Sequence, residues 1–247
     1  MMIAARWSML AVASMLMLAA FGATATDLQP SALRVAVTAV IGLIATLFWP
    51  GSAATPARTA FRIGAWSAAA ACLAAIALRI AGNSGQPFAR ILAACGMLLL
   101  ILLVTHAVAA GLEWRWRDQS EDAESAREMA GRAAALALAF VGSLPLWLGP
   151  AAELLAGRHP WIIDAVVGMS PLTHLAVASG NDLLRNQWFY QHSNLAALQF
   201  SYPSPAELIL AYGSVCLALA LIALASRGPR SRIDGASPTQ PTTEQAI

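Results

Sequence analysis

The sequence predicts an all-α fold, a polytopic membrane helical bundle with six transmembrane helices, or five if the first is cleaved. Three observations support this fold class. Hydrophobic residues make up 58% of the chain and charged residues only 11%, whereas soluble domains average about 25% charged residues. The mean hydropathy is +0.63. Long apolar runs, separated by clusters of Gly, Pro and Arg, cover most of the chain. The net charge of +2 gives no reason to expect nucleic-acid binding.

The first two predicted spans cover residues 8–25 and 33–49. The first fits a secretory signal peptide as well as a retained helix. We favour the retained helix, because apart from Arg6 the apolar run extends back to Met1. The second span stops at Trp49-Pro50-Gly51, an interfacial aromatic residue followed by two helix breakers.

The third and fourth spans are predicted over residues 63–80 and 91–112. Thr55-Pro56 precedes the third span and is a typical helix start, with Thr as the N-cap and Pro in the first turn. The fourth span exceeds the roughly 20 residues that a bilayer requires. Its polar exception is His106, which fits a proton path or a hydrogen bond to a neighbouring helix. We expect the hydrogen bond.

The stretch Glu113–Arg132 is the only densely charged part of the chain. It predicts a helix in water with a capping box at 118–121 and an i,i+4 pair between Glu128 and Arg132. This helix fits a solvated connector or a docking site for a partner protein. The small-residue spacing Gly131/Ala135/Ala139 is attributed to chance, because the chain is so rich in Ala.

The fifth and sixth spans are predicted over residues 133–148 and 207–225, with an outer cap at 149–206 between them. Pro145 lies inside the fifth span. Ser204-Pro205-Ala206-Glu207 combines a capping box with a Pro in the first turn and predicts the start of the sixth. Residues 1–226 thus form a single transmembrane domain. The polar residues 227–247 predict a disordered cytoplasmic tail.

The distribution of arginines predicts the orientation, since all fifteen basic residues are Arg. With six spans and the N-terminus inside, the cytoplasmic set is Arg6, Arg58, Arg62, Arg115, Arg117, Arg127, Arg132, Arg227, Arg230 and Arg232. The opposite set is Arg34, Arg79, Arg90, Arg158 and Arg185. The positive-inside rule then places both termini in the cytoplasm. We therefore expect a multi-pass protein of the bacterial inner membrane, with the outer cap in the periplasm.

The outer cap contains short apolar segments broken by Gly and Pro, each too short to span a bilayer. They predict short re-entrant or interfacial helices between the last two spans, one of which begins at Ser170-Pro171 and ends at Gly180. Asp182 and Arg185 can pair at i,i+3 on one of these helices. The candidate residues of a substrate path or of the cap are His159, Asp164, His174, Asp182, Arg185, Trp188 and His192.

The three histidines of the cap also raise the possibility of a metal site. Their spacings of fifteen and eighteen residues match no compact ligand motif, so ordinary hydrogen-bonded histidines are preferred. No G-x-S-x-G is present, and Ser193 next to His192 is adjacency in sequence only. We therefore expect no metal, no cofactor and no catalytic residue. A membrane-embedded enzyme that uses the His and Asp residues of this segment remains the second alternative.

The layout of Met1–Ala225 resembles the membrane subunits of ABC-2-type exporters. Those subunits have six spans, cytoplasmic termini and broken re-entrant helices on the outer side between the fifth and sixth spans. Gly149–Ser204 carries most of this resemblance. Thr55–Arg62 falls where that family places the cytoplasmic helix that meets the ATPase, while the family's long amphipathic helix before the first span has no counterpart in Met1–Trp7.

The resemblance implies a permease-type subunit of a transporter. No G-x-x-x-x-G-K-[ST] motif occurs, so the ATPase would be a separate cytoplasmic chain. Candidate docking residues for it are Arg58, Arg62 and Arg127. The expected surroundings are the lipid bilayer and a homo- or hetero-oligomer. The first alternative is an accessory or assembly subunit of a larger membrane complex, since few ionisable residues lie within the spans.

Overall fold

The computed structural model describes residues 30–81, 87–117, 119, 122–156, 158–159, 161–184 and 201–225. Within these ranges the chain is helical and contains no strand, which confirms the all-α prediction for this part. The helices are α2 (Pro30–Leu47), α3 (Pro56–Ala81), α4 (Phe88–Arg117), α5 (Ala123–Gly142), α6 (Leu144–Trp147), α7 (Gly149–Ala156), α8 (Trp161–Met169), α9 (Pro171–Ser179) and α11 (Pro205–Ala225).

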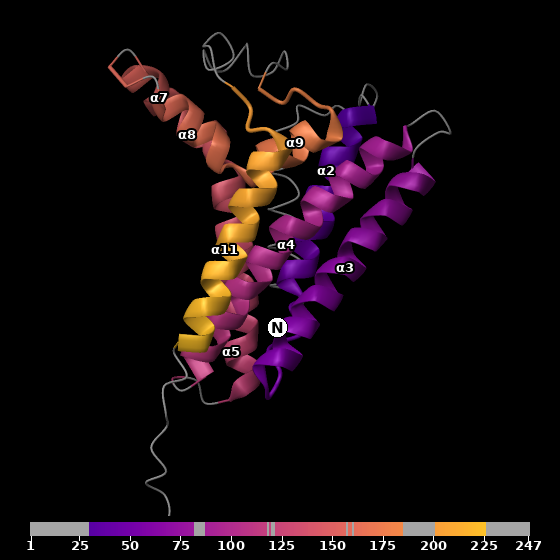
Figure 1. Ribbon diagram of the computed structural model, residues 1–247, viewed down its shortest axis with the longest axis vertical. Helices are drawn as coiled ribbons and strands as arrows, with labels where there is room; N and C mark the ends of the chain where they lie inside the picture. The colour runs from indigo at the N-terminus through magenta and orange to yellow at the C-terminus, as the bar shows by residue number, and fades with distance from the viewer. Residues whose placement is uncertain are drawn as a thin grey trace, which may run out of the picture.

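The long helices α2, α3, α4, α5 and α11 alternate in direction within one bundle (Figure 1). We call the end that holds the start of α3 and the start of α5 the lower end, and the opposite one the upper end. Helices α7 and α8 project from the bundle at the upper end, and α9 turns back onto it (Figure 1). α9 packs against α2, α4 and α5, while α11 packs on α4.

The outward faces of the bundle are apolar. Phe61 and Ile80 of α3 are 78% and 81% exposed, and Leu210 and Leu217 of α11 are also exposed. So much exposed hydrocarbon is unusual on a soluble protein and suits contact with lipid. Both α3 and α4 are long and apolar enough to cross a membrane, and α8 with α9 would make a third crossing if the bent pair counts as one span.

The prediction of six transmembrane helices is not supported. Among the described residues, only two or three helices are long and apolar enough to cross a membrane. In α2 and α11 the described apolar stretches are Ser31–Leu47 and Pro205–Leu221, with 17 residues each. The fifth predicted span, residues 133–148, falls on the second half of α5 and on the short helix α6, with a break at Ser143 between them. The predicted first span, residues 8–25, lies outside the described residues.

The predicted helix starts are confirmed at three places. α3 begins at Pro56, and the Thr55 hydroxyl accepts the Arg58 N–H. The Ser170 hydroxyl accepts the Thr173 N–H at the start of α9. At the start of α11, Ser204 and Glu207 exchange the two hydrogen bonds of a capping box. These motifs satisfy N–H groups that have no partner within their own helix.

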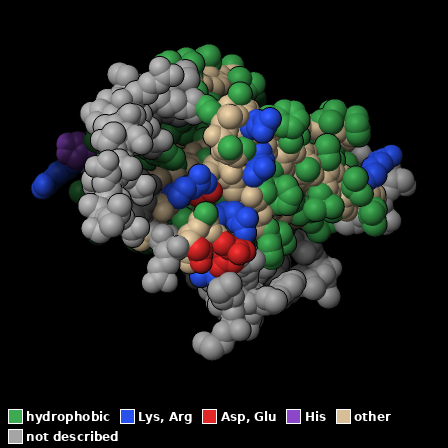
Figure 2. Space-filling model, turned by 90° about the horizontal axis from the view of Figure 1, so that it is seen from below, with side chains coloured by type: hydrophobic (Ala, Val, Ile, Leu, Met, Phe, Trp, Pro, Cys, Tyr) green, Lys and Arg blue, Asp and Glu red, His purple; other side chains and the backbone are tan. Residues whose placement is uncertain are grey.

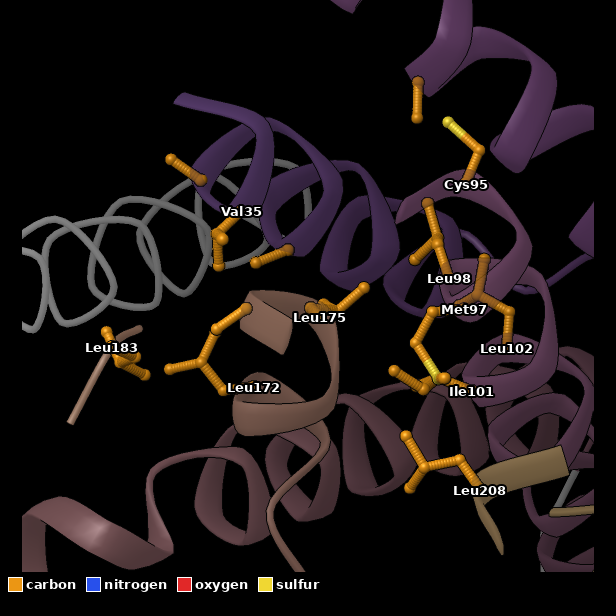
Figure 3. Packing of buried hydrophobic residues seen from close by; sticks show 14 of the residues in the cluster. Val35, Cys95, Met97, Leu98, Ile101, Leu102, Leu172, Leu175, Leu183 and Leu208 are labelled. Carbon is orange, nitrogen blue, oxygen red and sulfur yellow. The ribbon is translucent and has the colours of Figure 1, made fainter. Parts of the chain in front are cut away.

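The main hydrophobic core lies where α2, α4 and α9 meet. Figure 3 shows Val35 of α2, Leu98 and Ile101 of α4, and Leu172 and Leu175 of α9 pointing into this region. All five side chains are buried. The core therefore joins the long helices to the short helix α9 and fixes the upper part of the bundle.

The small-residue spacing attributed to chance is used in the fold. Gly131 of α5 faces the last turn of α2, where a Cβ atom would lie 3.2 Å from the Thr46 carbonyl oxygen and 3.3 Å from that of Leu47. Ala135, one turn further along α5, is buried with Leu47. Small side chains at these positions let the two helix backbones approach closely.

Candidate functional site

A buried carboxylate organises the lower end of the bundle. Glu113 of α4 is 2% exposed and accepts hydrogen bonds from the Trp49 indole Nε1 at 3.1 Å, the Ser52 N–H at 2.7 Å and the Ser52 hydroxyl at 2.9 Å. The Arg117 guanidinium donates to it from one turn away at 2.9 Å. Charge-assisted bonds of this kind offset the cost of removing the carboxylate from water. They hold the turn between α2 and α3 against the end of α4.

The same network continues into the bundle. The Trp49 ring stacks on the His106 ring with centroids 5.2 Å apart. His106 is fully buried, and its Nδ1 lies 2.8 Å from the Ser67 hydroxyl of α3. The prediction that His106 bonds to a neighbouring helix is therefore confirmed. Together Ser67, His106, Trp49, Ser52 and Glu113 form a continuous line of contacts that we call the lower network.

Three arginines from three helices surround the turn at Gly51 and Ser52. Arg62 of α3 donates to the Gly51 carbonyl oxygen at 3.1 Å, and Arg117 of α4 donates to the Ser52 hydroxyl at 2.9 Å. Arg127 of α5 packs on Gly51, whose φ of +88° is one that glycine adopts without strain. Viewed from below, arginine and acidic side chains gather on this face between apolar ones (Figure 2).

The predicted docking residues are thus partly brought together. Arg62 and Arg127 meet the same turn, whereas Arg58 is exposed one helical turn before Arg62. Arg127 also forms an exposed ion pair with Glu124 at 3.0 Å. Glu113, the deeply buried carboxylate described there, is already bonded to Trp49 and Arg117.

The charged connector was predicted as solvated throughout, and the structure corrects this at its beginning. α4 continues to Arg117, so Glu113 belongs to that helix and is buried. α5 begins after Asp122, whose side chain accepts the Ser125 N–H, and the capping box expected at 118–121 lies largely outside the described residues. The predicted pair of Glu128 and Arg132 is confirmed at 3.2 Å.

Two arginines lie at the upper end around the C-terminus of α9. The guanidinium of Arg34 donates twice to the Ser179 carbonyl oxygen, at 3.0 and 2.7 Å. Gly180 ends α9 with a φ of +71°, and the guanidinium of Arg90 lies against it. The carbonyl end of a helix carries partial negative charge, which stabilises nearby cations. Arg34 and Arg90 therefore attach α9 to the beginnings of α2 and α4.

The junction of α8 and α9 is sharply bent and internally bonded. The two helices meet at an angle of 79°, and the Ser170 hydroxyl at the bend donates to the Gly142 carbonyl oxygen at 2.6 Å. His174 of α9 lies 2.9 Å from the Tyr212 hydroxyl of α11 through Nδ1 and 3.0 Å from the Gly168 carbonyl oxygen through Nε2. These bonds satisfy the polar groups that the break exposes.

Replacing Tyr212 by Phe tests the link between α9 and α11. The change keeps the ring but removes the hydroxyl, so the buried His174 Nδ1 loses its partner. We expect a loss of about 1–3 kcal/mol in the free energy of unfolding, measured by chemical denaturation in detergent. Ser143→Ala is the control, because the Ser143 hydroxyl only supplements the backbone bonds of its own helix. Equal effects of the two changes would contradict this role.

The other residues predicted for the outer cap do not converge. His159 lies beside Trp161 at the exposed tip of the α7–α8 hairpin. Asp164 accepts the Ser201 N–H at 3.2 Å, and Asp182 accepts the Tyr202 hydroxyl. Among the described residues no group of three or more His, Cys, Asp or Glu side chains is placed to hold a metal ion. The remaining predicted residues, Arg185, Trp188 and His192, lie outside the described part of the chain.

Sequence reasoning missed most of the lower network. The useful signal was Glu113, an acidic residue at the end of the most apolar run and directly before Trp114. A carboxylate there must either reach water or find donors in the protein. Trp49 and Ser52 supply those donors from more than sixty residues away, which no local pattern indicates.

The fold and these networks define a class: an all-helical chain with an apolar exterior, two or three helices able to cross a membrane, and polar networks at both ends. No protein-family model, no curated protein and no solved structure matches the chain. The site itself is therefore the basis for a proposed function.

Proposed function

We propose that this chain is a polytopic, permease-type subunit of a membrane transporter that works with a separate ATPase chain. The observation that carries the proposal is the broken helix pair α8–α9, bent by 79° and packed by α9 against α2, α4 and α5. Within a membrane, interrupted helices are tolerated where protein buries them or where they line a cavity. In transporters such interruptions mark the substrate path.

The proposed subunit has six spans and both termini in the cytoplasm, and the distribution of its arginines supports this orientation. Because neighbouring long helices alternate in direction, the described arginines separate into two sets (Figure 1). The lower end has Arg58, Arg62, Arg115, Arg117, Arg127 and Arg132, and the upper end has Arg34, Arg79, Arg90 and Arg158. Under the positive-inside rule, the larger set favours a cytoplasmic lower end. The α7–α9 region is then on the outer side.

The lower network supports an ATPase docking on the first turns of α3. Arg58 is exposed there, and the turn before it is bonded to Glu113 through Ser52. Glu113 contacts Trp49, which stacks on the buried His106. A movement of the start of α3 would therefore be passed through Glu113 and Trp49 to His106 inside the bundle. A subunit driven by a cytoplasmic ATPase requires such a connection between its docking surface and its interior.

The test is ATP hydrolysis that co-purifies with the tagged chain from its native membrane in mild detergent. We expect Arg58→Glu to remove most of this activity, because it reverses the charge of an exposed docking residue without touching the lower network. Arg79→Glu at the upper end is the matched control and should keep the activity. Absence of co-purifying ATPase from the unaltered chain would contradict the proposal.

One observation favours the accessory or assembly subunit as a second candidate. The space where α2, α4, α5 and α9 meet has a volume of only about 20 Å³, room for about one water molecule. These described helices thus pack closely in a single copy, which suits a non-transporting subunit. The ATPase experiment separates the two, since an assembly subunit would purify with other membrane proteins and without ATP hydrolysis.

A further inference from the structure

An apolar groove runs along the outside of the bundle between α2 and α3. It has a volume of about 410 Å³, and Ile44 of α2 and Trp66, Ala69 and Leu73 of α3 are among the residues that line it. The Trp66 indole Nε1 donates a hydrogen bond to the Ala45 carbonyl oxygen at 2.8 Å, and this bond joins α2 to α3 at the bottom of the groove. Ile44 and Leu73 are 37% and 56% exposed. The groove therefore opens away from the core.

Arg62 lies next to the lower end of this groove without lining it. It precedes Trp66, the first α3 residue of the lining, by four positions, which places both side chains on one face of α3. Its Nη1 donates to the carbonyl oxygen of Gly51, just past the end of α2. Among the described residues no carboxylate forms an ion pair with Arg62. The positive charge of its guanidinium can therefore attract an anionic ligand at the lower end of the groove.

We propose that the groove and Arg62 form a binding site for a phospholipid with an anionic headgroup. One acyl chain lies in the groove, and the phosphate accepts hydrogen bonds from Arg62. The proposal rests on α3 crossing the bilayer, as in the proposed function, but not on an ATPase partner.

Both halves of the site match the chemistry of such a lipid. An acyl chain in the groove gains dispersion contacts along its whole length. Arginine presents planar donors that fit phosphate oxygens, and α3 begins where headgroups would lie.

The surroundings of Arg62 select for negative charge. Arg58 lies exposed one turn before it on α3, and none of the described carboxylates forms an ion pair with Arg58. A headgroup with its own positive charge, such as phosphocholine, would bring that charge toward these arginines. A headgroup with a net negative charge gains from each of them. The site therefore prefers phosphatidylglycerol to phosphatidylcholine.

Native mass spectrometry of the purified chain, incubated with phosphatidylglycerol or phosphatidylcholine in detergent, tests this preference. We expect phosphatidylglycerol to bind more tightly, and Arg62→Ala to weaken that binding about tenfold through loss of a charge-assisted hydrogen bond. Arg115→Ala, an exposed arginine of the same end on α4, should leave it unchanged. Equal binding of the two lipids by the unaltered chain overturns the proposal.

A second pair of variants tests the groove itself. Ala69→Trp fills it and should reduce the binding of phosphatidylglycerol at least as much as Arg62→Ala does. Ala68→Trp, also exposed on α3 but pointing about 100° away around the helix, is the matched control and should bind normally. Normal binding by Ala69→Trp overturns the proposal.

A measurement on the unaltered chain guards against misfolded variants. Phosphatidylglycerol with a photoreactive acyl chain should label the groove residues of α2 and α3 after illumination. Label confined to other helices overturns the proposal. A cross-link that places residues 1–29 of this chain in the groove overturns it as well.

Discussion

Replacing Glu113 by Ala is expected to lower the free energy of unfolding by about 1–3 kcal/mol for each buried donor that loses its acceptor. The carboxylate accepts from Trp49, Ser52 and Arg117. Without it, the Trp49 indole N–H and the Ser52 N–H lose their acceptor in a place that water reaches poorly. The turn between α2 and α3 would then separate from α4.

Denaturation in detergent, followed by circular dichroism, measures this loss. Glu124→Ala is the matched control, because the ion pair of Glu124 with Arg127 has side chains 71% and 37% exposed. Exposed pairs contribute at most about 1 kcal/mol. Comparable losses for the two variants would show that the carboxylate of Glu113 does not hold the lower end together. Under the proposed function, Glu113→Ala should also reduce the co-purifying ATPase activity.

Replacing Gly131 by Leu is expected to be the most disruptive single change in α5. A Cβ atom at this position would already lie 3.2 Å from the Thr46 carbonyl oxygen and 3.5 Å from the Cβ of Trp49. The first of these neighbours is helix backbone, which cannot turn aside as a flexible side chain can. Overpacking costs about 1–3 kcal/mol even in adaptable cores, and we expect the upper part of that range or more.

The comparison variant is Gly96→Ala in α4, where no atom lies within 4 Å of an added Cβ. Alanine there should stabilise the helix by about 0.5–1 kcal/mol, because glycine is the poorer helix former. Midpoints of thermal unfolding of the two variants should therefore move in opposite directions. A Gly131→Leu protein as stable as the unaltered chain would mean that α5 does not pack closely on α2.

The lower network also explains why the beginning of the charged stretch is not solvated as predicted. The charged run from Glu113 suggested a helix leaving the membrane, yet α4 stays helical to Arg117 and buries its carboxylate. A hydropathy profile gives every charged residue the same polar value, whether or not the folded protein supplies hydrogen-bond partners for it. A carboxylate that accepts four hydrogen bonds is stable inside the protein, and three of the four come from Trp49 and Ser52, more than sixty positions away.

By itself the sequence determined where several helices begin and that the chain carries an apolar exterior. Thr55-Pro56, Ser170-Pro171 and Ser204-Pro205 act within one turn, so capping chemistry is readable from adjacent residues. Only the tertiary structure decided that Gly131 meets α2, that Glu113 meets Trp49 and that His174 and Tyr212 form a pair. These contacts join residues from 38 to more than 60 positions apart. Burial and pairing depend on which helix faces which, and helical periodicity does not contain that information.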